Sequence, residues 1–146
     1  MTDDNTWQPE VDHLHDRRAR MLAMGGEERI KRQHDGGKLT ARERVAAMVD
    51  DGSFREFKHL QGEPEYGPDG KLVSFLPKGM VEGIAKVDGR KVVVAAGDFT
   101  VRGGSGAGTA RGALGAEMSA SQRALEWQIP FVRLLDAAGG SVRGFE

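Results

Sequence analysis

Apolar residues recur at helical spacing among many charged residues in positions 1–60. In the stretch VDHLHDRRARMLAM, four apolar residues fall on one face of a predicted helix: Val11, Leu14, Met21 and Leu22. The pair Gly25–Gly26 interrupts this helix, and EERIKRQH predicts a second, short helix after it. We expect such narrow apolar faces to lie on a larger protein surface, because they are too small to form a core of their own.

A third helix is predicted in the stretch LTARERVAAMVDDGSF. Thr40 followed three residues later by Glu43 is a capping-box signature, in which each side chain accepts a hydrogen bond from the other residue's backbone N–H. The apolar stripe of this helix consists of Val45, Met48 and Val49. Gly52 is predicted to end the helix.

The pattern changes after residue 60. The stretch GEPEYGPDGKLVSFLPKG contains three prolines and four glycines, so we interpret residues 61–79 as an irregular loop. From Met80 onward, the apolar runs MVEGIAKV and KVVVAAGD predict two strands. The pair Asp88–Gly89 between them is a strong signal for a two-residue hairpin turn.

The last third of the chain predicts a helix followed by a strand. ARGALGAEMSASQRALEW predicts a helix that ends before Pro130 and has small side chains on its surface: Ala110, Ala113, Ala120 and Ala124. PFVRLLDA predicts a short buried strand. We therefore divide the chain into a helical segment (1–60), a loop (61–79) and an α/β segment (80–146). Because a buried strand and a Gly-Gly turn normally lead into another helix, we expect the last segment to begin a larger domain.

Composition narrows the function classes. A chain of 146 residues suits one modest domain, and its net charge of −1 gives no basic excess for nucleic-acid binding. The chain has no cysteine, which excludes disulfides and cysteine-ligated zinc. MTDDNTWQPE is not a secretory signal, and no apolar run is long enough to cross a bilayer. We therefore expect a cytoplasmic protein with neither a nucleic-acid nor a membrane partner.

The stretch FTVRGGSGAGTARGALG is unusually rich in glycine, which is costly to order. It is not a dinucleotide fingerprint, because Arg111 stands where the third glycine belongs. It is not a phosphate-binding P-loop either, because Thr109 stands where the lysine belongs. A flexible linker, an anion hole and the close approach of a helix remain as interpretations.

The ionisable side chains give weaker signals. We interpret the four histidines as exposed polar residues: His13, His15, His34 and His59. Asp98 and Asp136 each end a predicted strand, where aspartates more often cap a helix or turn than act in catalysis.

A second glycine pair, Gly139–Gly140, follows the last predicted strand. Its backbone N–H groups suit either a tight turn or an oxyanion hole, which stabilises an enolate without an ionisable side chain.

Three segments are specific in combination: RRARMLAMGGEERIKRQHDGGKLTARERVAAMVDDGSFREF, DFTVRGGSGAG and LLDAAGG. Together they resemble the N-terminal part of the carboxyltransferase (beta) subunit of biotin-dependent acyl-CoA carboxylases, of the propionyl-CoA and methylcrotonyl-CoA carboxylase type. The resemblance runs from about Arg17 to the end of the chain. The absence of cysteine argues against the bacterial acetyl-CoA type, which has a cysteine zinc ribbon.

The resemblance implies a crotonase-like (ClpP/crotonase) fold of β-β-α units, here preceded by amphipathic helices. It also implies a carboxyl transfer in which carboxybiotin yields CO2 and a biotin enolate, and the enolate removes the α-proton of an acyl-CoA. The acyl enolate then attacks CO2. Backbone donors hold both enolate oxygens, so neither a metal nor a nucleophile is needed.

The implied substrates are acetyl-, propionyl- or methylcrotonyl-CoA-like, as in fatty acid metabolism. The implied partners are a biotin carboxylase or biotin carrier subunit and further copies of the chain, in a hexamer.

The resemblance also implies site residues. Gly139 and Gly140 match the pair that holds the thioester oxygen. The matching substrate-binding loop consists of Gly103, Gly104, Ser105 and Gly106.

The chain departs from the family pattern in two ways. The family reads Asp-Ser-Gly-Gly-Ala-Arg where this chain has one residue more after Asp136. Family members are also several times longer and carry a second crotonase-like domain that holds biotin. We therefore expect this chain alone to be inactive. The alternative is a truncated, non-catalytic homologue or fragment that keeps only an assembly surface.

Overall fold

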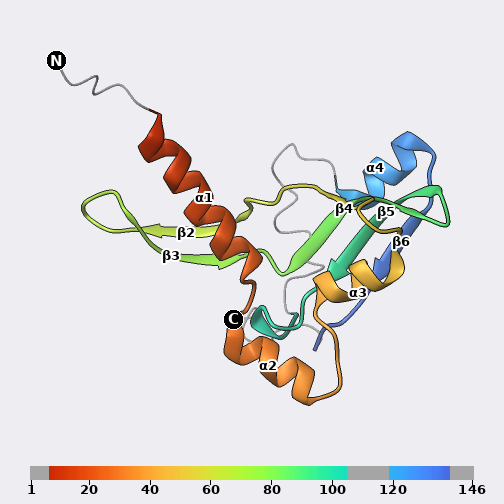
Figure 1. Cartoon of the computed structure of the whole chain (residues 1–146), viewed down its shortest axis with the longest axis horizontal. Helices are drawn as coiled ribbons and strands as arrows, with labels where there is room; N and C mark the ends of the chain where they lie inside the picture. Colours follow the sequence, from red (N-terminus) through yellow and green to blue (C-terminus); the bar gives the residue numbers. More distant parts are fainter. Residues whose placement is uncertain (1–6, 105–118, 139–146) are drawn as a thin grey trace, which may run out of the picture.

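The computed structural model describes residues 7–104 and 119–138, as a mixed sheet with helices on both faces and a projecting arm (Figure 1). The elements are α1 (Gln8–Leu22), α2 (Glu27–Asp35), α3 (Ala41–Met48), β1 (Arg55–Glu56), β2 (Gly62–Tyr66), β3 (Leu72–Pro77), β4 (Met80–Val87), β5 (Arg90–Gly97), the 3₁₀ turn η1 (Arg102–Gly104), α4 (Ala120–Trp127) and β6 (Phe131–Leu134).

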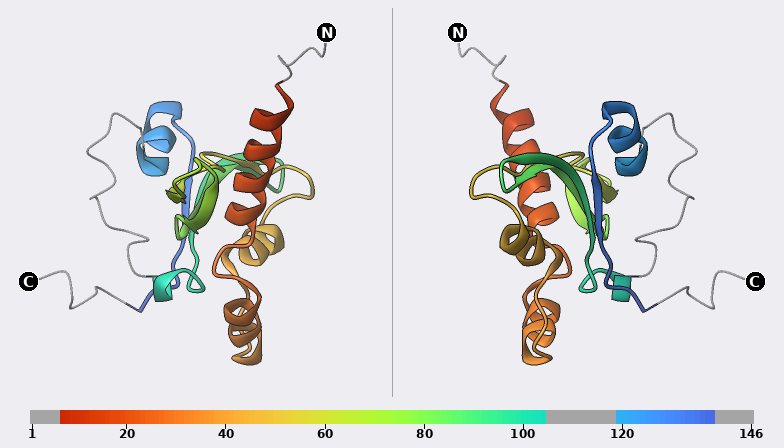
Figure 2. Two further views of the ribbon diagram at one scale, coloured as in Figure 1. Left: turned by 90° about the vertical axis from the view of Figure 1, so that its left-hand side faces the viewer. Right: turned by 90° about the vertical axis from the view of Figure 1, so that its right-hand side faces the viewer.

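The main sheet has the strand order β1-β4-β5-β6. Strand β4 pairs with β1 and β5 in antiparallel fashion, whereas β5 and β6 are parallel. Helix α4 lies on one face of this sheet, and α3 lies on the other (Figure 2). The structure therefore shows an α/β arrangement, in which the predicted order of strand, strand, helix and strand from Met80 onward is confirmed.

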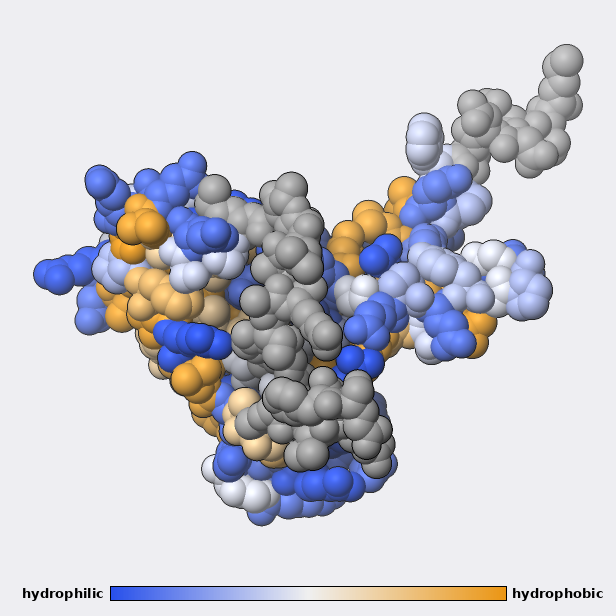
Figure 3. Space-filling model, turned by 180° about the vertical axis from the view of Figure 1, so that it is seen from behind, coloured by the Kyte–Doolittle hydropathy of each residue, from blue (hydrophilic) through white to orange (hydrophobic). Residues whose placement is uncertain are grey.

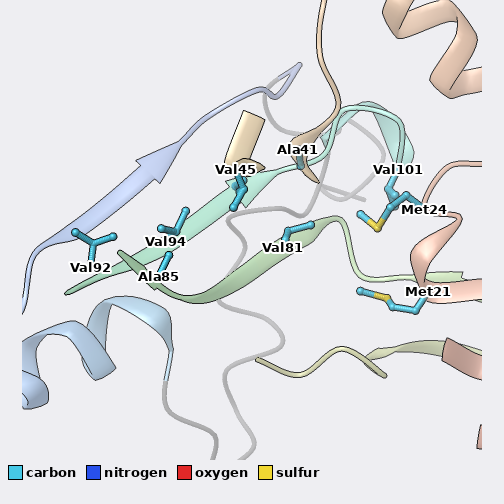
Figure 4. Packing of buried hydrophobic residues seen from close by; sticks show 10 residues of the cluster. Met21, Met24, Ala41, Val45, Val81, Ala85, Val92, Val94 and Val101 are labelled. Carbon is cyan, nitrogen blue, oxygen red and sulfur yellow. The ribbon is translucent and has the colours of Figure 1, made fainter. Parts of the chain in front are cut away.

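Strand β5 is buried on both faces, which explains why its sequence reads as one apolar run. Its alternate residues Val92, Val94 and Ala96 face the cluster that contains α3, and Val93 and Ala95 face α4. Full burial of a valine side chain stabilises a fold by roughly 1.5–3 kcal/mol. The main cluster joins Val92, Val94 and Ala96 to apolar residues from α1, α3 and β4 (Figure 4). Helices α1 and α3 thus share one core with the sheet.

The β4–β5 hairpin forms as predicted. Asp88 and Gly89 both have positive φ, of 49° and 76°, as a turn that matches the twist of two strands requires. The Asp50 carboxylate accepts hydrogen bonds from both turn amides, at 2.9 Å from Asp88 N and 2.8 Å from Gly89 N. The closing pair of the hairpin is Val87 and Arg90.

Helix α3 begins with the predicted capping box. Thr40 Oγ1 accepts from Glu43 N at 3.3 Å, and Glu43 Oε2 accepts from Thr40 N at 2.8 Å. Val45 is 2% exposed, and Met48 and Val49 pack against the same cluster. The expectation that this helix lies on a larger surface is therefore confirmed. Helix α3 ends at Met48, ahead of the predicted stop at Gly52.

The predicted apolar face of α1 is wrong for three of its four residues. Met21 is buried, but the side chains of Val11, Leu14 and Leu22 are exposed. The reason is that α1 turns a different face to the hairpin formed by β2 and β3. The contacts on that face pair His13 with Tyr66, Arg17 with Phe75, and Arg20 with the carbonyls of Leu72 and Val73.

The interpretation of residues 61–79 as an irregular loop is also wrong, because β2 and β3 form an antiparallel hairpin there. Pro64 and Pro77 suggested a loop, since proline cannot donate a ladder hydrogen bond. In a two-stranded sheet each strand has one free edge, so a proline can lie in it without loss. The resulting arm of α1, β2 and β3 projects from the main sheet (Figure 1).

The helix predicted from Ala110 begins later in the described residues. Ser119 is its N-cap, with extended backbone, and forms a second capping box with Gln122. Helix α4 therefore starts at Ala120, and residues 105–118 lie outside the described residues. The predicted strand after Pro130 is confirmed as β6.

Candidate ligand site

The chain turns sharply after β5, and the buried Asp98 holds this turn. The Asp98 carboxylate accepts hydrogen bonds from Ala41 N at 3.2 Å, from Thr100 N at 2.8 Å and from Thr100 Oγ1. Ala41 is the first residue of α3, so Asp98 caps that helix while it shapes its own turn. The interpretation of this strand-end aspartate as a cap is confirmed.

The same turn is tied to the connection between α1 and α2. Gly25 N donates to Thr100 Oγ1 at 3.1 Å, and Arg29 Nη1 donates to Thr100 O at 3.4 Å. A Cβ atom added to Gly25 would lie 2.1 Å from Thr100 O, which is far inside van der Waals contact. Only glycine at this position allows the two turns to approach so closely.

Two of the predicted substrate-binding glycines lie at the end of this turn. Gly103 and Gly104 have φ of 62° and 72°, which favours glycine. Gly103 O accepts a hydrogen bond from Ala138 N at 3.0 Å. A Cβ atom on Gly104 would lie 2.6 Å from Asp136 O and 2.7 Å from Ala137 Cα.

The structure thus brings the glycine turn after β5 against the segment after β6, at the same end of two parallel neighbouring strands. Open α/β sheets bind ligands at such strand ends. The other predicted site residues lie outside the described residues: Ser105, Gly106, Gly139 and Gly140. Their roles stay predictions.

Asp136 joins the segment after β6 to α2 and the residues that follow it. Gln33 Nε2 donates to Asp136 Oδ2 at 2.9 Å, and Lys38 Nζ lies 3.5 Å from Asp136 Oδ1. Gln33 Nε2 also donates to Leu39 O at 3.3 Å, which explains why this glutamine is buried in a charged helix. Asp136 lies two residues beyond the end of β6 and is held in a network of side chains, whereas its expected role as a helix or turn cap stays a prediction.

A cavity of about 540 Å³ opens between α2 and the turn after β5, both at the lower end of the molecule in Figure 1. The described residues that line it are Arg29, Arg32, Gln33, Gly36, Lys38, Phe99, Thr100, Arg102 and Gly103. None of these is acidic, and the Lys38 ammonium lies 5.3 Å from the centre of the Phe99 ring. This site is not apparent in the sequence, because its basic residues come from two segments that only folding brings together.

The four histidines are exposed, as predicted. One of them, His34, contacts Glu43 at 2.9 Å. The hydrogen bond from His34, followed by the one from the Thr40 backbone, lowers the pKa of Glu43 below its ordinary value. Within residues 7–104 and 119–138, no group of three His, Asp or Glu side chains is placed to hold a metal ion. No helix in these two ranges is long and apolar enough to span a membrane.

Comparisons with known proteins identify the class. The carboxyl transferase domain family matches residues 32–146, which is most of the chain. The chain therefore belongs to the carboxyl transferase domain family. The propionyl-CoA carboxylase carboxyltransferase subunit of Haloferax mediterranei is 38% identical over 140 residues, which cover 94% of this chain and 26% of that protein. The methylmalonyl-CoA decarboxylase subunit alpha of Veillonella parvula is 41% identical over 102 residues, covering 68% of this chain and 20% of that protein.

Solved structures agree with this assignment. The hexameric transcarboxylase 12S, with methylmalonyl-coenzyme A and methylmalonic acid bound, matches with a TM-score of 0.73 and 30% identity. The match covers 94% of this chain and 26% of the transcarboxylase chain. This chain therefore spans about a quarter of the length of these relatives.

Proposed function

We propose that the chain is the acyl-CoA-binding part of a biotin-dependent carboxyltransferase with a crotonase-like fold. The transferred carboxyl group moves from carboxybiotin to the α carbon of an acyl-CoA of the acetyl, propionyl or methylcrotonyl type. A biotin carrier or biotin carboxylase subunit presents the carboxybiotin, and further copies of the chain complete a hexamer. A cytoplasmic location stays a prediction from the sequence.

One observation supports this proposal most strongly. The Ala138 N–H donates to Gly103 O, so the segment that leads to Gly139–Gly140 begins beside the glycine turn after β5. Both segments continue from parallel neighbouring strands, β5 and β6. A thioester placed at this edge would meet backbone donors from two loops, and Gly140 carries no side chain to block its approach.

The chemistry needs donors and proximity rather than an ionisable side chain. Backbone N–H groups aimed at a developing enolate oxygen stabilise it most in the transition state. In our proposal, Gly139 and Gly140 supply these donors, and Gly103–Gly106 shape the wall of the substrate site. Holding two reactants in register contributes roughly 7–11 kcal/mol in well-oriented systems. The donors for the biotin oxygen would come from a second domain.

The alternative is a non-catalytic homologue that keeps only an assembly surface. One observation favours it: apolar side chains are exposed on the arm, in Val11, Leu14 and Leu22 of α1 and Val73 of β3. Hydrophobic residues are visible on the arm and, at the opposite side of the molecule, on the part that contains the main sheet (Figure 3). Such an assembly surface would also suit an oligomeric enzyme, so activity has to decide between the two functions.

The test uses the longer protein that contains this chain, together with its biotin partner. Gly140→Val should lower the kcat of carboxylation by about 10²–10³-fold with little change in CoA affinity, because the added side chain disturbs the approach of the enolate oxygen to its backbone donors as severely as the loss of one donor would. Gly70→Val is the control for backbone strain away from the site: Gly70 lies in the turn between β2 and β3, where a Cβ meets nothing within 4 Å but the φ of 75° makes a valine strained. Near-normal turnover of the Gly140 variant would show that the glycine pair is only a turn. Absence of carboxylation in the unaltered protein would favour the assembly alternative.

A further inference from the structure

Helix α2 buries a glutamine rather than an apolar side chain. Among the described residues of this helix, Gln33 alone is buried, with 7% of its surface exposed. A buried amide has to be hydrogen-bonded, because burial without a partner costs free energy. An apolar side chain would attach the helix to the rest of the molecule without that requirement. The buried amide therefore indicates a more specific task at this position.

Both N–H groups of the Gln33 side chain are used. Its Nε2 atom donates to Asp136 Oδ2 at 2.9 Å and to Leu39 O at 3.3 Å. The Gln33 carbonyl oxygen accepts from Lys38 N at 3.0 Å, so the connection between α2 and α3 folds around the same residue. Lys38 Nζ lies 3.5 Å from Asp136 Oδ1. The Asp136 carboxylate is thus held at both oxygens, by residues 103 and 98 positions earlier in the chain.

The backbone that follows Asp136 is held by the glycine turn after β5. Ala138 N donates to Gly103 O at 3.0 Å, and the Asp136 carbonyl oxygen lies 2.6 Å from the position of a Cβ atom on Gly104. The chain is therefore fixed on both sides of residue 137 before it enters Gly139–Gly140. Glycine has the greatest backbone freedom, so the residues before the pair have to set its direction. Three residues span at most about 11 Å, so Asp136 is near enough to do so.

We infer that Gln33 is a positioning residue for the predicted oxyanion donors. Through Asp136, it fixes the direction in which the chain leaves β6 for Gly139–Gly140. The inference rests on the proposed function, in which this pair supplies the N–H groups for the enolate oxygen. A displacement of such groups by about 1 Å can lower a rate by about 10²-fold. Because the donors act mainly in the transition state, loss of Gln33 should lower kcat and leave KM almost unchanged.

The first experiment measures carboxylation of propionyl-CoA by the longer protein that contains this chain, together with its biotin partner. Gln33→Met keeps the length of the side chain but removes both donors. It should lower kcat by about 10–100-fold and change the KM for propionyl-CoA by less than about twofold. Gln8→Met is the matched control, because Gln8 Nε2 donates to Asp12 Oδ1 at 2.7 Å on the exposed part of α1. Its kcat should stay within about twofold of the unaltered protein.

A double-variant cycle tests whether Gln33 acts through Asp136. Asp136→Ala should lower kcat about as much as Gln33→Met does, and the double variant should lower it no further, because the two residues form one link. Far-ultraviolet circular dichroism checks that each variant is folded. The Asp136 side chain is 18% exposed, so Asp136→Ala supplies the test if Gln33→Met does not fold.

Amide hydrogen exchange of the 146-residue chain measures the same link without any activity. The Ala138 amide, which donates to Gly103 O, should exchange about tenfold faster in Gln33→Met than in the unaltered chain. The Val93 amide, which donates to Pro130 O, is the internal reference and should exchange at the same rate in both.

The outcomes separate this inference from the proposed function. Unchanged exchange at Ala138, or a kcat equal to that of Gln8→Met, would overturn the inference and leave the function standing. Additive losses in the double variant would also overturn it, because Gln33 would then act independently of Asp136. Absence of carboxylation in the unaltered protein would refute the function. Faster Ala138 exchange in Gln33→Met would in that case still support the positioning of this segment by Gln33.

Discussion

The two ends of strand β5 are built in different ways. Before Arg90 the chain enters the strand through the two-residue turn Asp88–Gly89, whose conformation its own residues favour. After Gly97 it leaves through the turn 98–104, whose shape depends on partners far away in the sequence. Asp98 bonds to Ala41, 57 residues earlier, and Thr100 bonds to Gly25, 75 residues earlier. At the first end, the turn residues themselves favour the conformation, and Asp50 adds a cap from 38 residues earlier; at the second end, the shape of the turn depends on its distant partners.

The candidate ligand site lies at only the second of these two ends of β5. The end at Asp88–Gly89 carries the Asp50 carboxylate as a cap on its two turn amides. The other end carries the basic cavity, the glycine turn and the contact with the segment after β6. A site assembled from distant segments is positioned only when all of them have docked. Three substitutions or pairs of substitutions test this contrast.

The largest effect is expected for Asp98→Ala compared with Asp50→Ala. Loss of the buried Asp98 carboxylate leaves Ala41 N, Thr100 N and Thr100 Oγ1 without their acceptor. We expect the free energy of unfolding to fall by about 3–5 kcal/mol, because these buried donors are left unpaired. Asp50 caps an exposed turn, so Asp50→Ala should cost only about 1 kcal/mol. Urea unfolding followed by circular dichroism measures both, and equal losses would remove the distinction between the two ends.

The second comparison is Gly104→Ala with Gly70→Ala. The two glycines have nearly the same φ, 72° and 75°, but only Gly104 has backbone atoms within 3 Å of an added Cβ. Gly70→Ala should therefore cost about 1 kcal/mol, the strain of a left-handed alanine. Gly104→Ala should cost about 2–4 kcal/mol, because the clash with Asp136 O adds to that strain. The same unfolding assay gives both values. Equal costs would mean that the segment after β6 moves away freely.

The smallest effect concerns the start of α3, where Glu43 makes only local contacts with His34 and Thr40. The pKa of Glu43 is lowered in the folded state from an ordinary value of 4.5, so its stabilising effect is fully present above that pH. As the pH falls through the lowered pKa, the carboxylate is protonated and the effect is lost. The unfolding free energies of the wild-type chain and Glu43→Gln should differ by under about 1 kcal/mol at pH 6 and converge toward pH 3. A difference independent of pH would contradict the role of the charge.

Local signals in the sequence predict the locally encoded parts of this molecule. The capping box at Thr40, the turn at Asp88–Gly89 and the strand after Pro130 each depend on residues close together in the chain. Other features depend on distant partners. The apolar stripe of α1 is exposed because the β2–β3 hairpin packs against another face of that helix, and this packing cannot be read from the sequence of α1. The prolines that suggested a loop are tolerated because this hairpin has free edges.

The candidate site follows the same rule. The glycine turn was visible in the sequence, because Gly103 and Gly104 stand in a dense glycine run after a strand. The requirement for glycine at Gly25 was not, since it arises from a carbonyl oxygen at Thr100 that only the folded chain brings near. The basic cavity likewise needs both α2 and the turn after β5 in place.

The long reach of Asp98 also sets an order of events on the ribosome. Chain growth proceeds at about 5–20 residues per second, so Asp98 is made roughly 3–11 s after Ala41, its partner 57 residues earlier. Throughout that interval the newborn helix α3 has its own local capping box, but the Ala41 amide has only water as an acceptor. Synthesis of β5 and of Asp98 after it is therefore the earliest point in translation at which this second cap of α3 can form.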